Sequence, residues 1–285
     1  MSVLLGQPQT PEKDGGSLRF LYHTVPGRVV LKLLSARWLS KVCGAYLDSG
    51  MSKWLIKRFI KSYGIDMTQY ESEDYGCFND CFTRKIRREL RPIDQREDIF
   101  ISPCDGYLTA YRIKDDTVLS VKQSTYSISR LIGSKEDAQR YDGGVCLVFR
   151  LCADNYHRYC FVDDCSLQEG RFIKGRLHTV RPIALEKYPV FTENCREVTF
   201  LETDNFGRAA QIEVGAMLVG KIKNHPISGR VKRGEEKGMF LYGGSTIVML
   251  LEKDIISVDK SVFDASQNGM EYFVKQGQPV AEKMR

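Results

Sequence analysis

The sequence predicts an α+β protein, with a helical N-terminal lobe followed by a β-rich, mainly antiparallel domain. In the first third of the chain, apolar residues recur at the spacing of amphipathic helices. From Ile99 onward, short runs of β-prone residues alternate with turns that contain Gly, Asp, Asn and Pro. A chain of 285 residues, with 42% hydrophobic and 27% charged residues, can bury a sizeable core.

The N-terminal lobe is expected to span residues 19–95, after a polar segment (1–18) that is expected to be disordered. Helical periodicity is present in GRVVLKLLSARWLSKVCGAYL (27–47) and MSKWLIKRFIKSYG (51–64). A third stretch, CFNDCFTRKIRRELRPID (77–94), predicts a short amphipathic helix that closes at Pro92. The apolar side chains expected near one face of the first stretch are Val30, Leu33, Leu34, Trp38, Val42 and Tyr46.

Positive charge is concentrated in this lobe. Between Ser17 and Lys61 there are nine Lys or Arg residues and one acid, Asp48, so the segment carries +8. The whole chain carries +6, which leaves the remainder at −2. A nucleic-acid-binding protein would more often be basic throughout its folded part, so no nucleic-acid partner is predicted. Two interpretations stay open: the helices cover the core with solvated basic residues, or their basic, aromatic face lies on an anionic membrane.

Several other classes of protein are disfavoured. No window is apolar enough to span a bilayer, and the N-terminus lacks the pattern of a secretory signal, so a cytoplasmic protein is expected. The nine cysteines are scattered, and Cys77 and Cys81 have no matching second pair, so we predict neither a metal site nor a disulfide framework. The stretch GGVCLVFR lacks the spacing of a phosphate loop, which argues against a nucleotide site.

The predicted β-rich domain, residues 96–285, contains three clusters of reactive side chains. They are SPCDG with Asp105, DNYHRYC with His157, and GGST with Ser245. Serine becomes a useful nucleophile when a base removes its proton, and a carboxylate usually holds that base. An Asp-Gly is more often only a turn, and a lone His more often structural. Because Ser245 does not lie in a G-x-S-x-G motif, an α/β-hydrolase is disfavoured.

Together these motifs resemble those of the phosphatidylserine decarboxylase proenzymes, which form their own pyruvoyl group. The resemblance extends from about Phe78 to Lys253 and rests on several separated stretches in the same order. They are FNDCFTRKIRRELRPID (78–94), ISPCDG (101–106), DNYHRYCFVDD (154–164), NFGRAAQIEVGAMLVGKI (205–222) and GEEKGMFLYGGSTIVMLLEK (234–253).

The resemblance implies a self-cleaving enzyme. Ser245 Oγ would attack the carbonyl of Gly244, and His157, oriented by Asp105, would take the hydroxyl proton. The chain would be cut between Gly244 and Ser245, and Ser245 would become a pyruvoyl group, the only cofactor implied. Chains 1–244 and 245–285 would stay associated. The pyruvoyl group would then act as the electron sink for loss of CO2 from phosphatidylserine, giving phosphatidylethanolamine.

The sequence departs from the family at Cys160, where many members carry a second histidine. Either His157 serves both self-cleavage and decarboxylation, or Cys160 helps as a proton donor, or Cys160 is only a buried thiol. Two alternative functions stay open: a pyruvoyl decarboxylase of another amino substrate, and an uncleaved lipid-binding pseudoenzyme. The expected location is peripheral, on the cytoplasmic face of the cell membrane, and a homodimer is left open.

Overall fold

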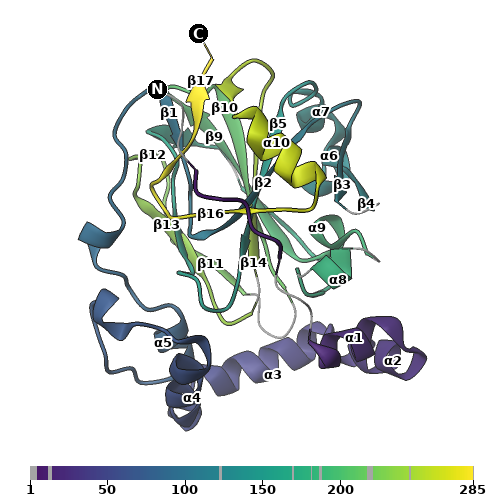
Figure 1. Cartoon of the computed structure of the whole chain (residues 1–285), viewed down its shortest axis with the longest axis vertical. Helices are drawn as coiled ribbons and strands as arrows, with labels where there is room; N and C mark the ends of the chain where they lie inside the picture. The colour runs from purple at the N-terminus through teal and green to yellow at the C-terminus, as the bar shows by residue number, and fades with distance from the viewer. Residues whose placement is uncertain are drawn as a thin grey trace.

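The predicted α+β class is confirmed by a computed structural model of the chain. The structure describes residues 5–11, 15–121, 124–168, 170–180, 182–185, 188–216, 221–243 and 245–284. Figure 1 shows a β-rich body with the N-terminal helices gathered at one end. Among the described residues, no helix is both long and apolar enough to cross a membrane.

The helical lobe consists of short helices with defined ends. The Thr24 side chain accepts a hydrogen bond from Gly27 N at 3.0 Å and so caps the second helix. Gly64 ends the fourth helix in the left-handed conformation, at φ 60°, which glycine adopts without a steric penalty. The helices are α1 (Gly16–His23), α2 (Val25–Leu34), α3 (Arg37–Leu47), α4 (Trp54–Tyr63) and α5 (Phe78–Phe82), with 3₁₀ turns η1 (Gly50–Ser52), η2 (Met67–Gln69) and η3 (Arg88–Leu90).

The body is built on a nine-stranded sheet in which every recorded strand pairing is antiparallel. The strand order is β12-β7-β9-β10-β14-β5-β2-β16, and β8 also pairs with β9. Central strands β14 and β5 are buried along their whole length, as the apolar runs IVMLL and VCLVF indicate. The strands are β2 (Gly106–Arg112), β5 (Val145–Leu151), β7 (Cys165–Leu167), β8 (Arg171–Ile173), β9 (Arg196–Thr203), β10 (Arg208–Val214), β12 (Arg230–Val231), β14 (Ser245–Leu251) and β16 (Tyr272–Val274).

Smaller elements cover the two faces of this sheet. One group of three strands has the order β1-β17-β15 and another the order β11-β13-β6, while β3 and β4 form a separate pair. Their bounds are β1 (Ile99–Ile101), β3 (Thr117–Val121), β4 (Ser124–Ser127), β6 (Arg158–Cys160), β11 (Ile222–Asn224), β13 (Glu236–Phe240), β15 (Ile256–Ser257) and β17 (Pro279–Lys283). The remaining helices are α6 (Ile128–Ile132), α7 (Lys135–Gln139), α8 (Pro182–Leu185), α9 (Val190–Glu193) and α10 (Lys260–Gln267).

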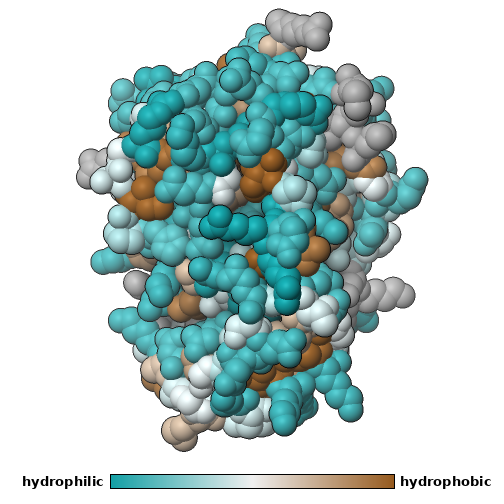
Figure 2. Space-filling model, turned by 90° about the vertical axis from the view of Figure 1, so that its left-hand side faces the viewer, coloured by the Kyte–Doolittle hydropathy of each residue, from teal (hydrophilic) through white to brown (hydrophobic). Residues whose placement is uncertain are grey.

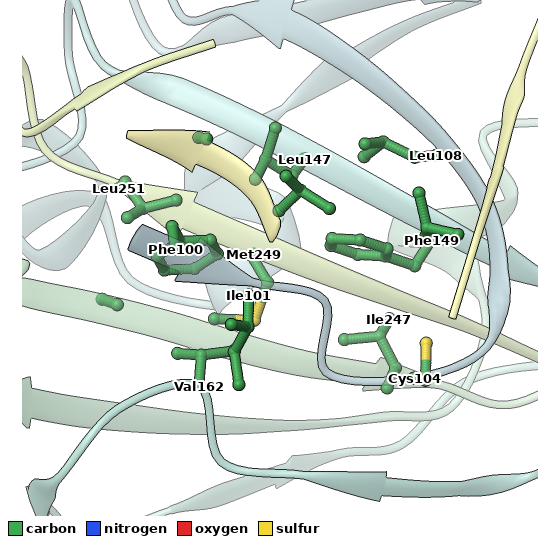
Figure 3. Packing of buried hydrophobic residues seen from close by; sticks show 14 of the residues in the cluster. Phe100, Ile101, Cys104, Leu108, Leu147, Phe149, Val162, Ile247, Met249 and Leu251 are labelled. Carbon is green, nitrogen blue, oxygen red and sulfur yellow. The ribbon is translucent and has the colours of Figure 1, made fainter. Parts of the chain in front are cut away.

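The side chains of β14 point alternately to the two faces of the sheet, and each face has its own hydrophobic cluster. Ile247, Met249 and Leu251 belong to one cluster, together with residues of β1, β17 and β13. Val248 and Leu250 belong to the other, under α1, α2 and the helices α6 to α9. Figure 3 shows the first cluster, with Cys104 and Ile247 close together at one end of the group. Ser245 is two residues before Ile247 on the same strand, so its side chain points to the same face of the sheet, that of the first cluster.

The predicted helix over residues 77–94 is shorter than expected, because α5 ends at Phe82. The chain then leaves the helix to pair with an earlier segment. Glu71 N donates to Lys85 O at 2.9 Å, and Arg87 N donates to Gln69 O at 2.9 Å. These long-range backbone hydrogen bonds replace the helical ones, so tertiary pairing overrides the local periodicity.

The first residues also differ from the expectation of disorder over 1–18. Residues 5–11 are described, and Gln9 exchanges backbone hydrogen bonds of 2.7 and 2.9 Å with Glu271. Helix α1 then begins at Gly16, inside the segment that was expected to be disordered. The N-terminal segment therefore packs along the β-rich body before the chain enters the helical lobe.

The helical lobe exposes much of its apolar face. The side chain of Trp38 is 61% exposed and that of Trp54 is 64% exposed. In Figure 2, apolar surface is visible at the lower end of the molecule, where Figure 1 places the lobe. The exposed apolar residues of the lobe are Phe20, Val25, Val29, Val30, Leu33, Trp38, Val42, Tyr46, Met51, Trp54 and Tyr63. The helices therefore bury part of their apolar side chains and expose the rest.

Candidate active site

Ser245 begins β14 and lies between two neighbouring strands. It pairs with Leu151 at the end of β5, and Thr246 pairs with Val214 at the end of β10. Ser245 is 0% exposed, and its Oγ has no hydrogen-bond partner among the described residues. A buried hydroxyl without a partner costs free energy, so it is a feature that folding alone does not favour.

The loop before Ser245 requires glycine. Gly243 has φ 137°, a conformation that side-chain-bearing residues rarely adopt. The predicted acyl donor, Gly244, lies outside the described residues. Tyr242, just before the two glycines, donates its backbone N–H to Asn79 Oδ1 at 3.1 Å. The Tyr242 ring also packs edge-on against Phe78 and Phe82, with centroid distances of 5.0 and 5.2 Å.

His157 is fully buried and has a defined tautomer. Its Nδ1 lies 2.9 Å from Asn155 O. Because a carbonyl oxygen only accepts, Nδ1 carries the proton and Nε2 keeps its lone pair. Nε2 has no partner among the described residues. Burial, assisted by the nearby Arg84 guanidinium, lowers the pKa of His157 to about 3. The imidazole is therefore neutral at neutral pH and able to accept a proton at Nε2.

Aromatic packing brings His157 to the same end of the sheet as Ser245. The Phe82 ring lies 4.1 Å from the His157 ring and also contacts Tyr242, as described above. The backbone of His157 is fixed as well, because its carbonyl accepts from Phe240 N at 2.9 Å. The short helix α5 thus contacts both the histidine and the loop that leads into Ser245.

Asp105 is buried, but its hydrogen bonds do not go to His157. Arg91 binds both of its carboxylate oxygens, through Nε at 2.8 Å and Nη2 at 2.5 Å. Gln276 N also donates to Oδ1 at 2.9 Å. The orienting group for His157 is therefore the Asn155 carbonyl and not the predicted Asp105 carboxylate. Asp105 instead joins the end of the helical lobe to the C-terminal part of the chain.

Cys160 lies on β6 and is also buried. Burial raises the pKa of its thiol to about 12, so it is protonated at neutral pH. It lines a cavity of about 660 Å³ together with Arg91, Arg233 and Gln276. Neither His157 nor Ser245 lines that cavity. This cavity is therefore not at the predicted nucleophile, and the role of Cys160 as a helper of His157 stays a prediction.

A buried ion pair near Ser245 was missed by the sequence analysis. Lys237 Nζ donates to Glu213 Oε2 at 2.8 Å, and both residues are buried. Glu213 pairs with Ile247 on the face that Ser245 also occupies, so it is the diagonal neighbour of Ser245. Nothing in the alternating pattern of AAQIEVGAM distinguishes Glu213 from a solvent-facing acid.

A second cavity, of about 400 Å³, lies between α3 and the β-rich body. Its walls include the lysines Lys41 and Lys221, the apolar side chains of Phe172 and Leu177, and Leu241 of the loop before Ser245. The groove therefore combines apolar walls with two cations and one carboxylate, that of Asp48. The groove thus connects the helical lobe with the neighbourhood of the candidate nucleophile.

Comparisons with known proteins agree on one family. The sequence profile described as phosphatidylserine decarboxylase matches residues 78–282. The chain is 45% identical to phosphatidylserine decarboxylase proenzyme 2 of Clostridium acetobutylicum, over 94% of this chain and 92% of the relative. It is 36% identical to phosphatidylserine decarboxylase proenzyme of Clostridium botulinum, over 95% of each chain. For the proenzyme of Ruminiclostridium cellulolyticum the identity is 39%, over 93% of this chain and 91% of the relative.

Proposed function

Because the chain belongs to the phosphatidylserine decarboxylase family, we propose that it cuts itself between Gly244 and Ser245 and then decarboxylates phosphatidylserine to phosphatidylethanolamine. The observation that carries this proposal is the buried Ser245 hydroxyl, which has no partner among the described residues and lies two residues after Gly243, a glycine with positive φ. The neutral His157, whose Nε2 has no partner within the part of the chain that the structure describes, supplies a proton acceptor at the same end of the sheet.

In the proposed self-cleavage, Ser245 Oγ loses its proton to His157 and bonds to the carbonyl carbon of Gly244. The bond between that carbon and Ser245 N breaks, and the nitrogen takes up a proton, which leaves an ester. A base then removes the Cα proton of residue 245, and the Cβ–Oγ bond breaks, which releases the Gly244 carboxylate and leaves a dehydroalanine at position 245. Water converts this residue to a pyruvoyl group and ammonia. His157 serves as acceptor because burial keeps it neutral, and Asn155 fixes its tautomer.

The buried environment of residue 245 fits a pyruvoyl group. The strand partner Leu151 and the core residue Ile247 exclude water on one face, and antiparallel pairing along β14 would hold the new N-terminus in place. When present, the pyruvoyl group supplies an electron sink that protein side chains lack. The same pairing explains how chains 1–244 and 245–285 would stay associated after the cut, because β14 is central in the sheet.

The helical lobe supports a lipid substrate and a peripheral position on an anionic membrane. Soluble proteins rarely expose large contiguous apolar patches without a partner. Trp38 and Trp54 lie within the exposed apolar face, and tryptophan favours the membrane interface. The groove between α3 and the body would offer phosphatidylserine a route from this surface toward the loop before Ser245.

Mass spectrometry of the purified protein under denaturing conditions tests the proposed function. Two chains are expected, ending at Gly244 and beginning at residue 245, with the second chain resistant to N-terminal sequencing. A single uncut chain of 285 residues would exclude both the self-cleavage and the pyruvoyl enzyme. That outcome would favour the alternative of a lipid-binding pseudoenzyme.

A pyruvoyl decarboxylase of another amino substrate would also cut itself, so the substrate needs its own assay. Release of CO2 from phosphatidylserine in vesicles can be compared with release from free serine and other amino acids. The exposed apolar face of the lobe favours the lipid. Faster turnover of a water-soluble amino acid than of phosphatidylserine would support the alternative.

Charge reversal on α4 is expected to weaken membrane binding. Lys57, Arg58 and Lys61 are exposed, and their replacement by Glu should reduce binding to vesicles rich in anionic lipid and make it less sensitive to salt. Each cation near such a surface contributes about 1 kcal/mol, so the triple variant should bind at least tenfold more weakly. Sedimentation with vesicles provides the measurement.

A matched control keeps the change in net charge but moves it to the β-rich body. Lys253, Lys260 and Lys275 are exposed there, and their replacement by Glu should leave vesicle binding nearly unchanged. If both triple variants lose binding equally, only net charge matters and the lobe is not the docking surface.

A further inference from the structure

Asn79 lies at the junction between the helical lobe and the loop that precedes Ser245. Its side chain is buried, with the residue only 3% exposed, and it comes from α5. Asn79 Nδ2 donates to Asp48 Oδ1 at 2.7 Å, and Asn79 Oδ1 accepts from Tyr242 N at 3.1 Å. The amide thus uses both of its ends, one toward the C-terminal cap of α3 and one toward the loop.

Other contacts hold Asn79 in this position. Ser52 Oγ, itself buried, accepts from Phe78 N at 2.9 Å and fixes the start of α5. The rings of Phe78 and Phe82 flank Tyr242, as described for the site. Packing and hydrogen bonding around α5 therefore restrict the position of the Asn79 amide, and a side chain needs such restriction in order to place another segment accurately.

We propose that Asn79 is a positioning residue for self-cleavage: it holds the backbone of Tyr242, at the start of the loop that leads to Ser245, against the C-terminal end of α3. This inference rests on the proposed function. Attack by Ser245 Oγ needs the carbonyl of the preceding residue at a defined place, and a glycine pair by itself allows many backbone conformations. The hydrogen bond from Tyr242 N removes part of this freedom, one residue before Gly243.

The proposal can be tested by exchanging the two partners of the hydrogen bond. Asn79→Asp keeps the acceptor for Tyr242 N but sets its second oxygen against the Asp48 carboxylate, and the like charges repel. Asp48→Asn alone keeps an oxygen that accepts from Asn79 Nδ2. In the double variant Asp48→Asn with Asn79→Asp, the hydrogen bond is reversed and both partners are satisfied again.

The readout is the rate at which newly made full-length chain is converted to two chains, followed by gel electrophoresis. We expect Asp48→Asn to cut nearly as fast as the wild type and Asn79→Asp to cut at least about tenfold more slowly, since small misplacements of reacting groups can cost two orders of magnitude. The double variant should recover to within about threefold of the wild type, a non-additivity that indicates direct coupling. Asn79→Leu should be slow with or without Asp48→Asn.

Folding is followed separately by urea unfolding of the same variants in a Ser245→Ala background, where no chain is cut. If Asn79 has a purely structural role, the rate of self-cleavage should fall only in those variants whose free energy of unfolding also falls, and in proportion to that loss. If the wild type cuts and Asn79→Asp cuts equally fast, or if the double variant shows no recovery, the positioning role of Asn79 is wrong and the proposed function stands. If the wild type remains uncut, the proposed function itself fails, and this inference fails with it.

Discussion

Replacing Ser245 with alanine is expected to leave the chain as one uncut polypeptide with no decarboxylase activity. The substitution removes the Oγ that would bond to the Gly244 carbonyl, so no ester and no pyruvoyl group can form. Little loss of stability is expected, because that hydroxyl has no hydrogen-bond partner among the described residues. Denaturing gels show the cut, and CO2 release from phosphatidylserine vesicles shows the activity.

Thr246 offers a matched control for this variant. Its hydroxyl is also buried and without a partner among the described residues, but alternation places it on the opposite face of β14. Thr246→Val preserves the shape of the side chain, and we expect it to cut and to decarboxylate. If Ser245→Ala still yields two chains divided at the same bond, Ser245 is not the nucleophile.

The residues proposed as nucleophile and base, Ser245 and His157, stand out in the sequence because their signals are local. Ser245 follows two glycines at the start of a strand, and His157 lies among polar residues beside another strand. Asn155, whose carbonyl orients His157, is two residues before it in the same motif, DNYHRYC. The sequence favoured Asp105 for this task because an Asp-His-Ser order suggests a triad. Chain order carries no information on which carboxylate or carbonyl reaches the ring.

The other partners of the site could not be predicted because they are distant in the chain. Asn79 and Tyr242 are 163 positions apart, and Phe82 reaches the His157 ring from a helix that forms part of the N-terminal lobe. Helical periodicity correctly predicted amphipathic helices in residues 27–62, but it cannot say whether an apolar face is buried or exposed. For Trp38 and Trp54 only the three-dimensional arrangement decides this.

Asp105→Asn is expected to destabilise the folded protein strongly. The side chains of Asp105 and Arg91 are 3% and 10% exposed, and the two form a bidentate pair. The amide would leave the Arg91 charge buried without compensation and would present an N–H group to another donor. Breaking a buried ion pair by removing one partner costs about 3–5 kcal/mol. The midpoint of urea unfolding, measured in the uncut Ser245→Ala background, should therefore fall markedly.

An exposed ion pair supplies the comparison. Lys53 and Asp74 also form a salt bridge, at 3.0 Å, but both side chains are largely exposed. Water screens such a pair, so Asp74→Asn should leave the unfolding midpoint within experimental error. The contrast between the two Asp→Asn variants would show that burial, and not pairing alone, determines the cost.

The same variant separates the two roles considered for Asp105. If Asp105 only orients His157, Asp105→Asn should slow self-cleavage and leave the unfolding midpoint unchanged. The structure favours the other result, because both carboxylate oxygens are engaged by Arg91 and Gln276 while Asn155 holds the imidazole. A loss of stability would therefore accompany any loss of cutting. Removing Arg91 as well, in Arg91→Met with Asp105→Leu, should restore part of the stability, because an apolar pair leaves no buried charge uncompensated.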